Sequence, residues 1–407
     1  MISPFANRYL GVIVCVWILV FFSAGCAVIK KEPPIEKEIA MIRMSAAAYP
    51  PFFDDMGYDG LEAAIQHSIS YLNKIPSDKA FRFGNDVFDT GHMVRSLEYF
   101  QNYIRTKPSK PELVKFIRSN YRVYRSAGRD ADGKVLFTGY YEPILQGSLE
   151  KTAEYRFPLY ARPDNLITVD LSLFSPRFKG EQIIGRIGNQ TFVPYYNRKE
   201  IDYELLLKGQ AQEIAWVGDP VDLFFLHVQG SGRIYLDNGI SINVHYHATN
   251  GRPYRSIGQL LINEGKIDRS EMSMQKIRSY LREHPDEITT VLNYNSSYVF
   301  FKTEKEGPLG YLEVKLIPGR SLALDRRIFP LSGLAFIETQ KPLVDGDGKI
   351  HTWTDCKRFV LNQDTGGVIR GPGRADLFWG NGAYAEIAAG HMQHTGNLYF
   401  LILKPDA

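Results

Sequence analysis

The amino-acid sequence predicts a mainly β protein of the α+β class, in which a helical N-terminal part precedes the β-structure. Apolar residues recur at helical spacing between about residues 49 and 120. From Val135 the pattern changes to short apolar runs of strand length, separated by glycine, proline and asparagine. Similar runs resume at Tyr298 and continue almost to the end of the chain. Because the chain has 407 residues, we expect two domains rather than one.

Helices are expected in two regions of the chain. Three stretches of the N-terminal part combine helical spacing with helix-start residues, namely 59–72, 92–100 and 111–120. A helical insert is expected at 257–264 and 274–283, within the β-rich region.

Strands are expected where apolar or aromatic runs end at turn residues. These runs lie at 135–143, 157–160, 223–232, 298–302, 333–338, 359–362 and 398–403. We interpret the run at 223–232 as a strongly apolar strand whose end carries Gln229 and Ser231 among glycines. Closely spaced short strands are typical of a small barrel or sandwich.

Residues 1–25 have the features of a secretory signal peptide. Arg8 precedes an apolar run at 9–22, which is shorter than the ~20 residues that span a bilayer, and small residues follow it. Cys26 comes directly after Ala-Gly, as at the lipidation point of a bacterial lipoprotein. An uncleaved N-terminal anchor is the alternative, because Ser23 stands where such signals carry Leu or Val. Either arrangement attaches the body to a membrane outside the cytoplasm.

A tether is expected at 26–45, because residues 30–38 are charged and rich in proline. Cys15 would leave with the signal and Cys26 would carry lipid, so Cys356 would be the one remaining thiol. A disulfide framework or a thiolate metal cluster is therefore excluded, and we expect Cys356 to be a buried apolar residue. The net charge of +3 and the lack of a basic stripe give no argument for nucleic-acid binding.

Other chemistries find little support in the sequence. His245 and His247 are spaced to share one strand face, but no third ligand for zinc is evident, so we expect exposed strand histidines. Ser231 lies in Gln-Gly-Ser-Gly-Arg, which lacks the Gly-x-Ser-x-Gly spacing of a nucleophile elbow. We expect neither a metal nor an organic cofactor.

The stretch from Asp364 to Gly380 carries the most chemical information. Asp364 and Asp376 stand among glycines, and Leu-Phe-Trp follows Asp376 directly. Glycines in such number predict tight turns or a close approach of the backbone to another group. An apolar neighbourhood raises the pKa of a carboxyl group, which keeps a general acid protonated near neutral pH. The alternative is a turn with ordinary surface aspartates.

Six short strings, taken together and in order, resemble the family of membrane-bound lytic murein transglycosylase A. The resemblance covers about residues 135–404. The strings are Thr138-Gly139-Tyr140-Tyr141, His227-Val228-Gln229-Gly230-Ser231-Gly232, Tyr254-Arg255-Ser256-Ile257-Gly258, Met272-Ser273-Met274-Gln275, Tyr298-Val299-Phe300-Phe301-Lys302 and Asp364-Thr365-Gly366-Gly367.

The resemblance implies a domain organisation and a set of site residues. It implies a double-psi β-barrel, or 3D domain, at 303–407, an inserted glycan-binding β-domain at 136–302, a helical part at 46–135 that packs on the barrel, and a groove between the two β-domains. It implies that Asp376 is the single catalytic carboxylate, supported by Asp364, Gly366 and Gly367. The substrate-binding residues that it implies are Tyr140, Tyr141, Gln229, Ser231 and Lys302.

The function that the resemblance implies is cleavage of the MurNAc–GlcNAc bond of peptidoglycan with formation of 1,6-anhydro-MurNAc. The expected partners are glycan strands, a membrane through the lipid on Cys26, and proteins of a cell-wall synthesis complex, with the chain itself a monomer. Ala27 rather than Asp follows the cysteine, so we expect an outer-membrane lipoprotein that faces the periplasm. A non-catalytic peptidoglycan-binding lipoprotein and a hydrolysing muramidase with a second carboxylate are the alternatives.

A Cys26→Ser variant tests the expected anchor. Without the thiol no lipid can be attached, so the protein should leave the membrane fraction or keep its signal uncleaved. Membrane fractionation with mass spectrometry of the N-terminus measures both outcomes. Processing identical to that of the wild type would mean that the anchor is a plain apolar helix.

Overall fold

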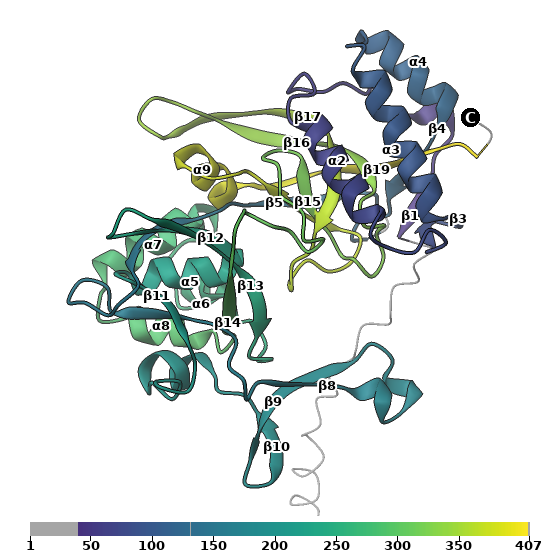
Figure 1. The fold of residues 1–407 in the computed structure, drawn as a ribbon. Helices are drawn as coiled ribbons and strands as arrows, with labels where there is room; N and C mark the ends of the chain where they lie inside the picture. Colours follow the sequence, from purple (N-terminus) through teal and green to yellow (C-terminus); the bar gives the residue numbers. More distant parts are fainter. Residues whose placement is uncertain (1–39, 131, 406–407) are drawn as a thin grey trace, which may run out of the picture. The chain divides into compact units, whose positions relative to one another are not determined.

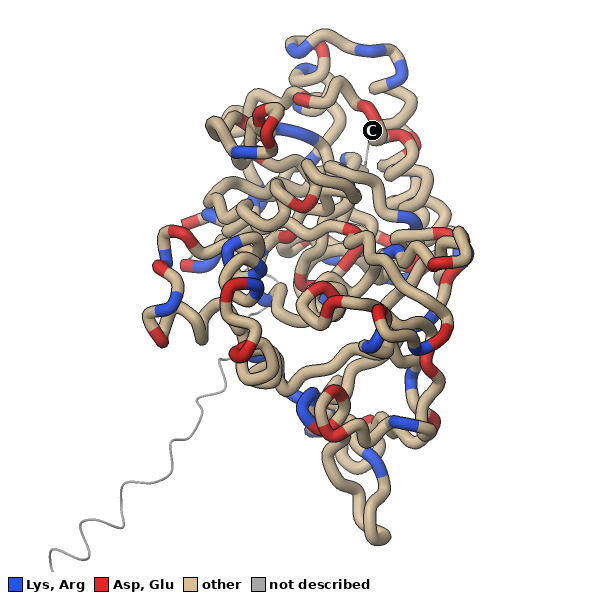
Figure 2. Tube along the Cα trace, turned by 90° about the vertical axis from the view of Figure 1, so that its left-hand side faces the viewer, with Lys and Arg blue, Asp and Glu red and all other residues tan. Residues whose placement is uncertain are grey.

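The computed structural model describes residues 40–130 and 132–405 (Figure 1). The predicted signal peptide, Cys26 and most of the predicted tether lie outside these residues. Within the described ranges, no helix is both long and apolar enough to cross a membrane. Lys and Arg are interspersed with Asp and Glu along the trace of these ranges (Figure 2).

Six strands close into a β-barrel. They are β5 (Val135–Tyr140), β15 (Ser321–Ala323), β16 (Leu334–Val344), β17 (Ile350–Asp364), β18 (Arg374–Phe378) and β19 (Gln393–Leu403). The strand order is β19-β16-β17-β15-β18-β5, and the ring closes because β5 pairs with β18 in parallel and with β19 antiparallel. Strands β4 (Tyr121–Ser126) and β1 (Met41–Arg43) extend the sheet outward from β19. The predicted α+β fold with a β-barrel is confirmed.

Alternation along the barrel strands separates a buried face from a partly exposed one. Phe137 on β5 and Ala375 and Leu377 on β18 are fully buried. Thr138, which follows Phe137, and Asp376, which lies between Ala375 and Leu377, are only partly buried. Successive strand residues point to opposite faces, so the polar side chains of β5 and β18 share the face away from the apolar core.

Helices from the N-terminal part of the chain pack against the barrel (Figure 1). They are α2 (Leu61–Leu72), α3 (Thr90–Ile104) and α4 (Lys110–Asn120), as predicted, with the hairpin β2 (Phe81–Phe83) and β3 (Asp86–Phe88) between α2 and α3. The carboxylate of Asp89 accepts the N–H of His92 and so caps α3, and Ser109 begins α4 with a capping box. Apolar residues of α2 and α3 join the same buried cluster as Phe336 and Phe359 of the barrel.

The segment between β5 and β15 forms two further sheets and four helices. The larger sheet contains β6 (Ile144–Ser148), β7 (Phe157–Tyr160), β11 (Glu213–Val217), β12 (Ser231–Leu236), β13 (Ser241–Thr249) and β14 (Val299–Glu304) in the order β14-β13-β12-β6-β11-β7. The smaller sheet contains β8 (Ile167–Asp170), β9 (Gln182–Gly188) and β10 (Thr191–Pro194). The helices are α5 (Pro220–Gln229), α6 (Ile257–Asn263), α7 (Met274–Glu283) and α8 (Ile288–Tyr294), and α9 (Ala383–His391) follows β18.

Short helical turns complete the described elements. They are η1 (Ala46–Ala48), η2 (Leu171–Leu173), η3 (Pro176–Phe178), η4 (Lys199–Tyr203) and η5 (Arg269–Glu271). The predicted helices at 257–264 and 274–283 correspond to α6 and α7, whereas α8 was not predicted. Strand β5 belongs to the barrel ring although the inserted domain was expected from residue 136, and the division into domains stays a prediction.

The prediction of a strand at 223–232 is wrong for most of this segment, which forms helix α5. Asp219 accepts the N–H groups of Val221 and Asp222, Pro220 takes the first helical position, and Gly230 ends the helix at φ 78°. The helix is apolar on two sides, because Leu223 and Leu226 pack on the larger sheet while Phe224 and Phe225 pack on α6–α8. A segment buried on two sides has no clear period, so its length alone could not distinguish helix from strand.

A buried ion pair fastens the segment before α2 to the barrel. Arg320 is fully buried, and its guanidinium donates to both carboxylate oxygens of Asp54 at 2.6 and 2.8 Å. The same side chain donates to the carbonyl oxygen of Asp59 at 2.8 Å and to that of Phe359 at 2.8 Å. Burial opposes ionisation of Asp54, but the hydrogen bonds and charge of Arg320 outweigh it and lower the pKa of Asp54. Strand β15 begins at Ser321, the residue after Arg320.

Candidate active site

Two aspartates flank a single alanine on the barrel wall. Ala323 of β15 lies opposite Asp364 of β17 on one side and opposite Asp376 of β18 on the other. Residues in register on neighbouring strands direct their side chains to the same face, and adjacent strands lie about 4.8 Å apart. The two aspartates therefore share a face, with their Cα atoms about 10 Å apart on either side of Ala323.

Asp376 is held by the neighbouring strand β5. Thr138 lies opposite Asp376, and its hydroxyl donates to the carboxylate at 2.8 Å. The guanidinium of Arg374 donates to the hydroxyl oxygen of Thr138 at 3.4 Å. Burial raises the pKa of Asp376 to about 6, with a further contribution from the charge of Asp364, although Thr138 and Arg374 oppose the shift.

Asp364 is held by one side chain and two backbone groups. The hydroxyl of Tyr140 donates to one carboxylate oxygen at 2.9 Å, while the N–H groups of Tyr311 and Thr365 donate to the other at 2.9 and 2.8 Å. Tyr140 is two residues beyond Thr138 on β5, so both side chains reach the same face. Burial raises the pKa of Asp364 to about 6 against these three hydrogen bonds.

The two carboxyl groups form a pair that can hold a proton near neutral pH. Each pKa lies well above the ordinary aspartate value, and the charge of Asp364 makes ionisation of Asp376 harder. With pKa values of about 6, a fraction of the molecules keeps a proton on each carboxyl at pH 6–7. A carboxylic acid in this state can donate a proton to a leaving group, and its conjugate base can accept one back. The predicted catalytic residue and its predicted supporting aspartate thus lie on one face.

The predicted supporting glycines follow Asp364 in a turn. The carbonyl of Gly366 accepts the N–H of Ile369 at 3.1 Å. A Cβ atom at Gly366 would come within 2.8 Å of the Ile369 side chain, whereas one at Gly367 would meet open space. The close approach at Gly366 therefore explains one of the two glycines.

The structure places one of the five predicted substrate-binding residues, Tyr140, in contact with the aspartate pair. Tyr141 is buried instead, and its backbone N–H donates to the side-chain oxygen of Gln229 at 3.0 Å. Gln229 is the last residue of α5 rather than the end of a strand. Ser231 and Lys302 contact neither aspartate: Ser231 bonds the His245 ring at 2.8 Å, and Lys302 pairs with two glutamates. A role of these residues in substrate binding stays a prediction.

The regular alternation that would put His245 and His247 on one strand face is interrupted in β13. The register between β13 and β14 shifts between Tyr246 and Ala248, which leaves His247 at a bulge. Among the described residues, no group of three or more His, Cys, Asp or Glu side chains could hold a metal ion. Cys356 is fully buried in β17, as predicted, and burial raises the pKa of its thiol to about 11.

Thr138 and Arg374 belong to the site but were not predicted. Strand alternation offered a signal for both, because Thr138 is two residues before Tyr140 and Arg374 two residues before Asp376. Alternation alone could not predict that β5 and β18 pair with each other. The two strands lie on either side of the long segment that forms the other sheets.

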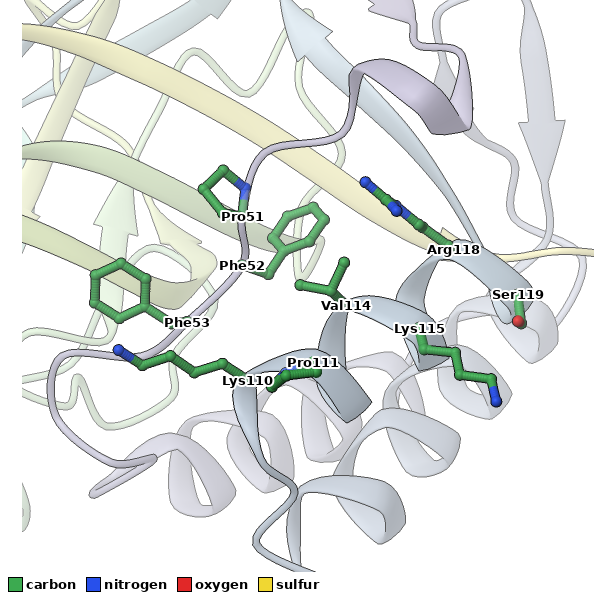
Figure 3. A pocket seen from close by; sticks show the side chains of 9 residues that line it. All are labelled: Pro51, Phe52, Phe53, Lys110, Pro111, Val114, Lys115, Arg118 and Ser119. Atoms are coloured by element: carbon green, nitrogen blue, oxygen red, sulfur yellow. The ribbon is translucent and has the colours of Figure 1, made fainter.

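A separate pocket lies on the helical part, away from the aspartate pair. It has a volume of about 480 Å³ and is lined by Pro51, Phe52, Phe53, Lys110, Pro111, Val114, Lys115, Arg118 and Ser119 (Figure 3). The extended segment 51–53 forms one wall and α4 the other. The amino group of Lys110 lies 4.5 Å from the centre of the Phe53 ring. No carboxyl group lines this pocket.

Two family models match the chain. Residues 136–302 match the MltA specific insert domain, and residues 320–402 match the 3D domain. The membrane-bound lytic murein transglycosylase A of Escherichia coli strain K12 is 31% identical over 287 residues, which cover 70% of each chain. The protein of the same name from Vibrio cholerae is 30% identical over 286 residues, which cover 68% of each.

Solved structures are similar over most of the chain. A membrane-bound lytic murein transglycosylase from Agrobacterium tumefaciens has a TM-score of 0.71 and 31% identity, and the match covers 89% of this chain and 98% of that one. E. coli MltA with bound chitohexaose has a TM-score of 0.70 and 26% identity, with 90% and 95% covered.

An Asp376→Asn variant tests the burial of this carboxyl group without any substrate. The folded-state pKa is raised to about 6, so Asp376 lowers the stability of the fold progressively as the pH rises from the ordinary aspartate pKa to about pH 6, in full above that pH, and not at all at lower pH. The variant should therefore be more stable than the wild type by roughly 1–3 kcal/mol at pH 7 and equally stable at pH 4. Urea unfolding at the two pH values measures the difference. Asp355→Asn, at an exposed carboxylate, is the control and should change little at either pH. Equal stability at pH 7 would contradict the burial of Asp376.

Proposed function

The chain belongs to the family of membrane-bound lytic murein transglycosylase A, enzymes that act on peptidoglycan, and we propose that it cleaves the β-1,4 bond between MurNAc and GlcNAc with formation of 1,6-anhydro-MurNAc. The observation that supports this reaction most strongly is the position of Asp376. Its carboxyl has a raised pKa, is hydrogen-bonded by Thr138 and shares a barrel face with Asp364. These are the properties required of a general acid that works near neutral pH.

The proposed reaction uses Asp376 twice. Its carboxylic acid gives a proton to the glycosidic oxygen, the bond from that oxygen to C1 of MurNAc breaks, and GlcNAc leaves with a free 4-hydroxyl. The C6 hydroxyl of the same MurNAc then attacks C1, and the Asp376 carboxylate takes the hydroxyl proton. The carboxyl group returns to its protonated state, and no water is consumed. A nucleophile within the substrate replaces a bound water, and such intramolecular geometry lowers a barrier by up to ~7–11 kcal/mol.

Asp364 and Tyr140 support Asp376 in this proposal. The charge of Asp364 raises the pKa of Asp376, which keeps the acid protonated. The Tyr140 hydroxyl holds the Asp364 carboxylate, and the Tyr140 ring packs at 5.2 Å from the ring of Phe378 on β18. Tyr140 thus connects β5, the strand that carries Thr138, to Asp364 on β17 and to Phe378 on β18.

A hydrolysing muramidase is the second candidate, and the same two aspartates favour it. An inverting glycosidase places an acid and a base on opposite sides of the bond, with room for a water. Asp364 would then be the base, which the sequence alone did not identify. A non-catalytic peptidoglycan-binding lipoprotein remains the third candidate and needs neither carboxyl.

Substrate, anchor and location complete the proposal. A structure of E. coli MltA contains bound chitohexaose, which supports binding of glycan strands by this chain, with Tyr140 as the first contact and Tyr141, Gln229, Ser231 and Lys302 as further candidates. The relatives are named membrane-bound, which supports attachment to a membrane. We propose that lipid on Cys26 tethers a monomer to the outer membrane, facing the periplasm, where proteins of a cell-wall synthesis complex are candidate partners.

Mass spectrometry of sacculi digested by the purified protein in H₂¹⁸O separates the three candidates. Lytic transglycosylation gives anhydro-muropeptides without ¹⁸O, hydrolysis gives reducing ends that carry ¹⁸O, and binding alone gives no soluble product. The Asp376→Asn variant should lose roughly 10²–10⁴-fold in rate, because an amide cannot supply the proton. Asp364→Asn should keep the anhydro product at a reduced rate. Reducing ends from the wild type, together with loss of turnover in Asp364→Asn, would support the muramidase instead.

A further inference from the structure

Strand β17 contains one extra residue where it runs beside β15. Ser321 lies opposite Leu361 and Leu322 opposite Asn362, but Ala323 lies opposite Asp364, so Gln363 has no partner in the ladder. An unbroken register would place Gln363 opposite Ala323, and Asp364 would then point to the other face. The bulge therefore determines that Asp364 shares a face with Asp376.

The side chain of the extra residue is buried and fully hydrogen-bonded. The Gln363 amide donates to the carbonyl of Ala64 at 2.7 Å and to the hydroxyl of Ser68 at 3.0 Å, both in α2. Its carbonyl oxygen accepts from the Ser321 hydroxyl at 2.7 Å. One side chain thus joins α2, β15 and β17 beside the extra residue.

An apolar side chain would fill the same space without fixing the register. Leaving any hydrogen bond of a buried amide unmade destabilises the folded state. Gln363 therefore favours the one register in which its side chain reaches all three partners. An apolar residue has no such preference. A slip of one residue would exchange the faces of Gln363 and Asp364.

We propose that Gln363 is a positioning residue: through it, α2 holds the β-bulge that directs the Asp364 carboxyl toward the face of Asp376. Gln363 has no hydrogen bond to either carboxylate and acts through the backbone of β17. The inference rests on the proposed function, since it gives Asp364 its place beside the proposed general acid.

The groups that face the two carboxyls define what a register slip would change. Asp364 faces Tyr140 of β5 and the N–H groups of Tyr311 and Thr365, while Asp376 faces Thr138 and Arg374. A slip would withdraw Asp364 from Tyr140 and remove its charge from Asp376, leaving Arg374 in place. Asp376 would then lose its proton at a lower pH than in the wild type.

The test compares Gln363→Met with Gln101→Met. Methionine keeps the length of the side chain and removes its hydrogen bonds. Gln101 is a matched control, because it is also buried and also bonds α2, through the carbonyl of Glu62 at 3.3 Å and the side chain of Gln66 at 2.6 Å. The pH dependence of anhydro-muropeptide release is measured for both variants, together with their urea unfolding. Ser321→Ala, which removes one of the three bonds, is the milder variant should Gln363→Met not fold.

Gln363→Met should lower the turnover rate at least about tenfold and move the loss of activity on the alkaline side to lower pH. Ser321→Ala should change both in the same direction by less. Gln101→Met should lose similar stability but keep the wild-type pH profile. An unchanged pH profile in both Gln363→Met and Ser321→Ala, or the same shift in the control, would overturn the proposal.

A measurement without substrate separates this inference from the proposed function. Two carboxyls with raised pKa values make the fold less stable as the pH rises from 4 to 7. That decrease should be smaller in Gln363→Met than in Gln101→Met, because Asp364 is no longer beside Asp376. Equal decreases would overturn the inference. A wild type without anhydro products but with unequal decreases would refute only the proposed function.

Discussion

The pairing of β5 with both β18 and β19 is the constraint on which the rest of the structure depends. It closes the six-stranded ring, and it joins a strand that precedes the long inserted segment to strands at the end of the chain. The same pairing brings Thr138 to Asp376 and Tyr140 to Asp364. Without this closure, the two aspartates would lack both side chains that hold them. Formation of the barrel and assembly of the site are therefore one event.

Strand register places both carboxyl groups of the site. Ladder partners share a face, so Asp364 and Asp376 are placed by register on either side of Ala323. Burial raises the pKa of both carboxyls, and the charge of Asp364 adds to the shift of Asp376. The helical part stabilises this arrangement from behind. Arg320 anchors the start of β15 to Asp54, and Gln363 connects the end of β17 to α2. The helical part thus stabilises the site, although none of its helices contributes a side chain to the aspartate pair.

The sequence predicted individual helices and strands better than it predicted which strands pair with each other. Three N-terminal helices and six of the seven expected strands follow from periodicity and turn residues, whereas the other strands were not predicted. Asp376 stood out because glycines and apolar residues surround it. Helix α5 was predicted as a strand, since burial on two sides removes the period that distinguishes the two. Thr138 and Arg374 were missed because their importance depends on strand order, which local patterns do not encode. The bulge at Gln363 could not be predicted either, because a single extra residue in a β-ladder leaves no periodic signal in the sequence.

The titration of the aspartate carboxyl groups tests the central claim most directly. Protein labelled with ¹³C at the aspartate carboxyl carbon would be followed by NMR from pH 3 to pH 8, with Asp376→Asn and Asp364→Asn used for assignment. We expect both carboxyls to titrate with apparent pKa values near 6, and Asp376 to titrate at a lower pH once Asp364 is replaced. Titration of both carboxyls below pH 5, with Asp376 unaffected by replacement of Asp364, would contradict the proposed roles of Asp376 as the general acid and of Asp364 as its support.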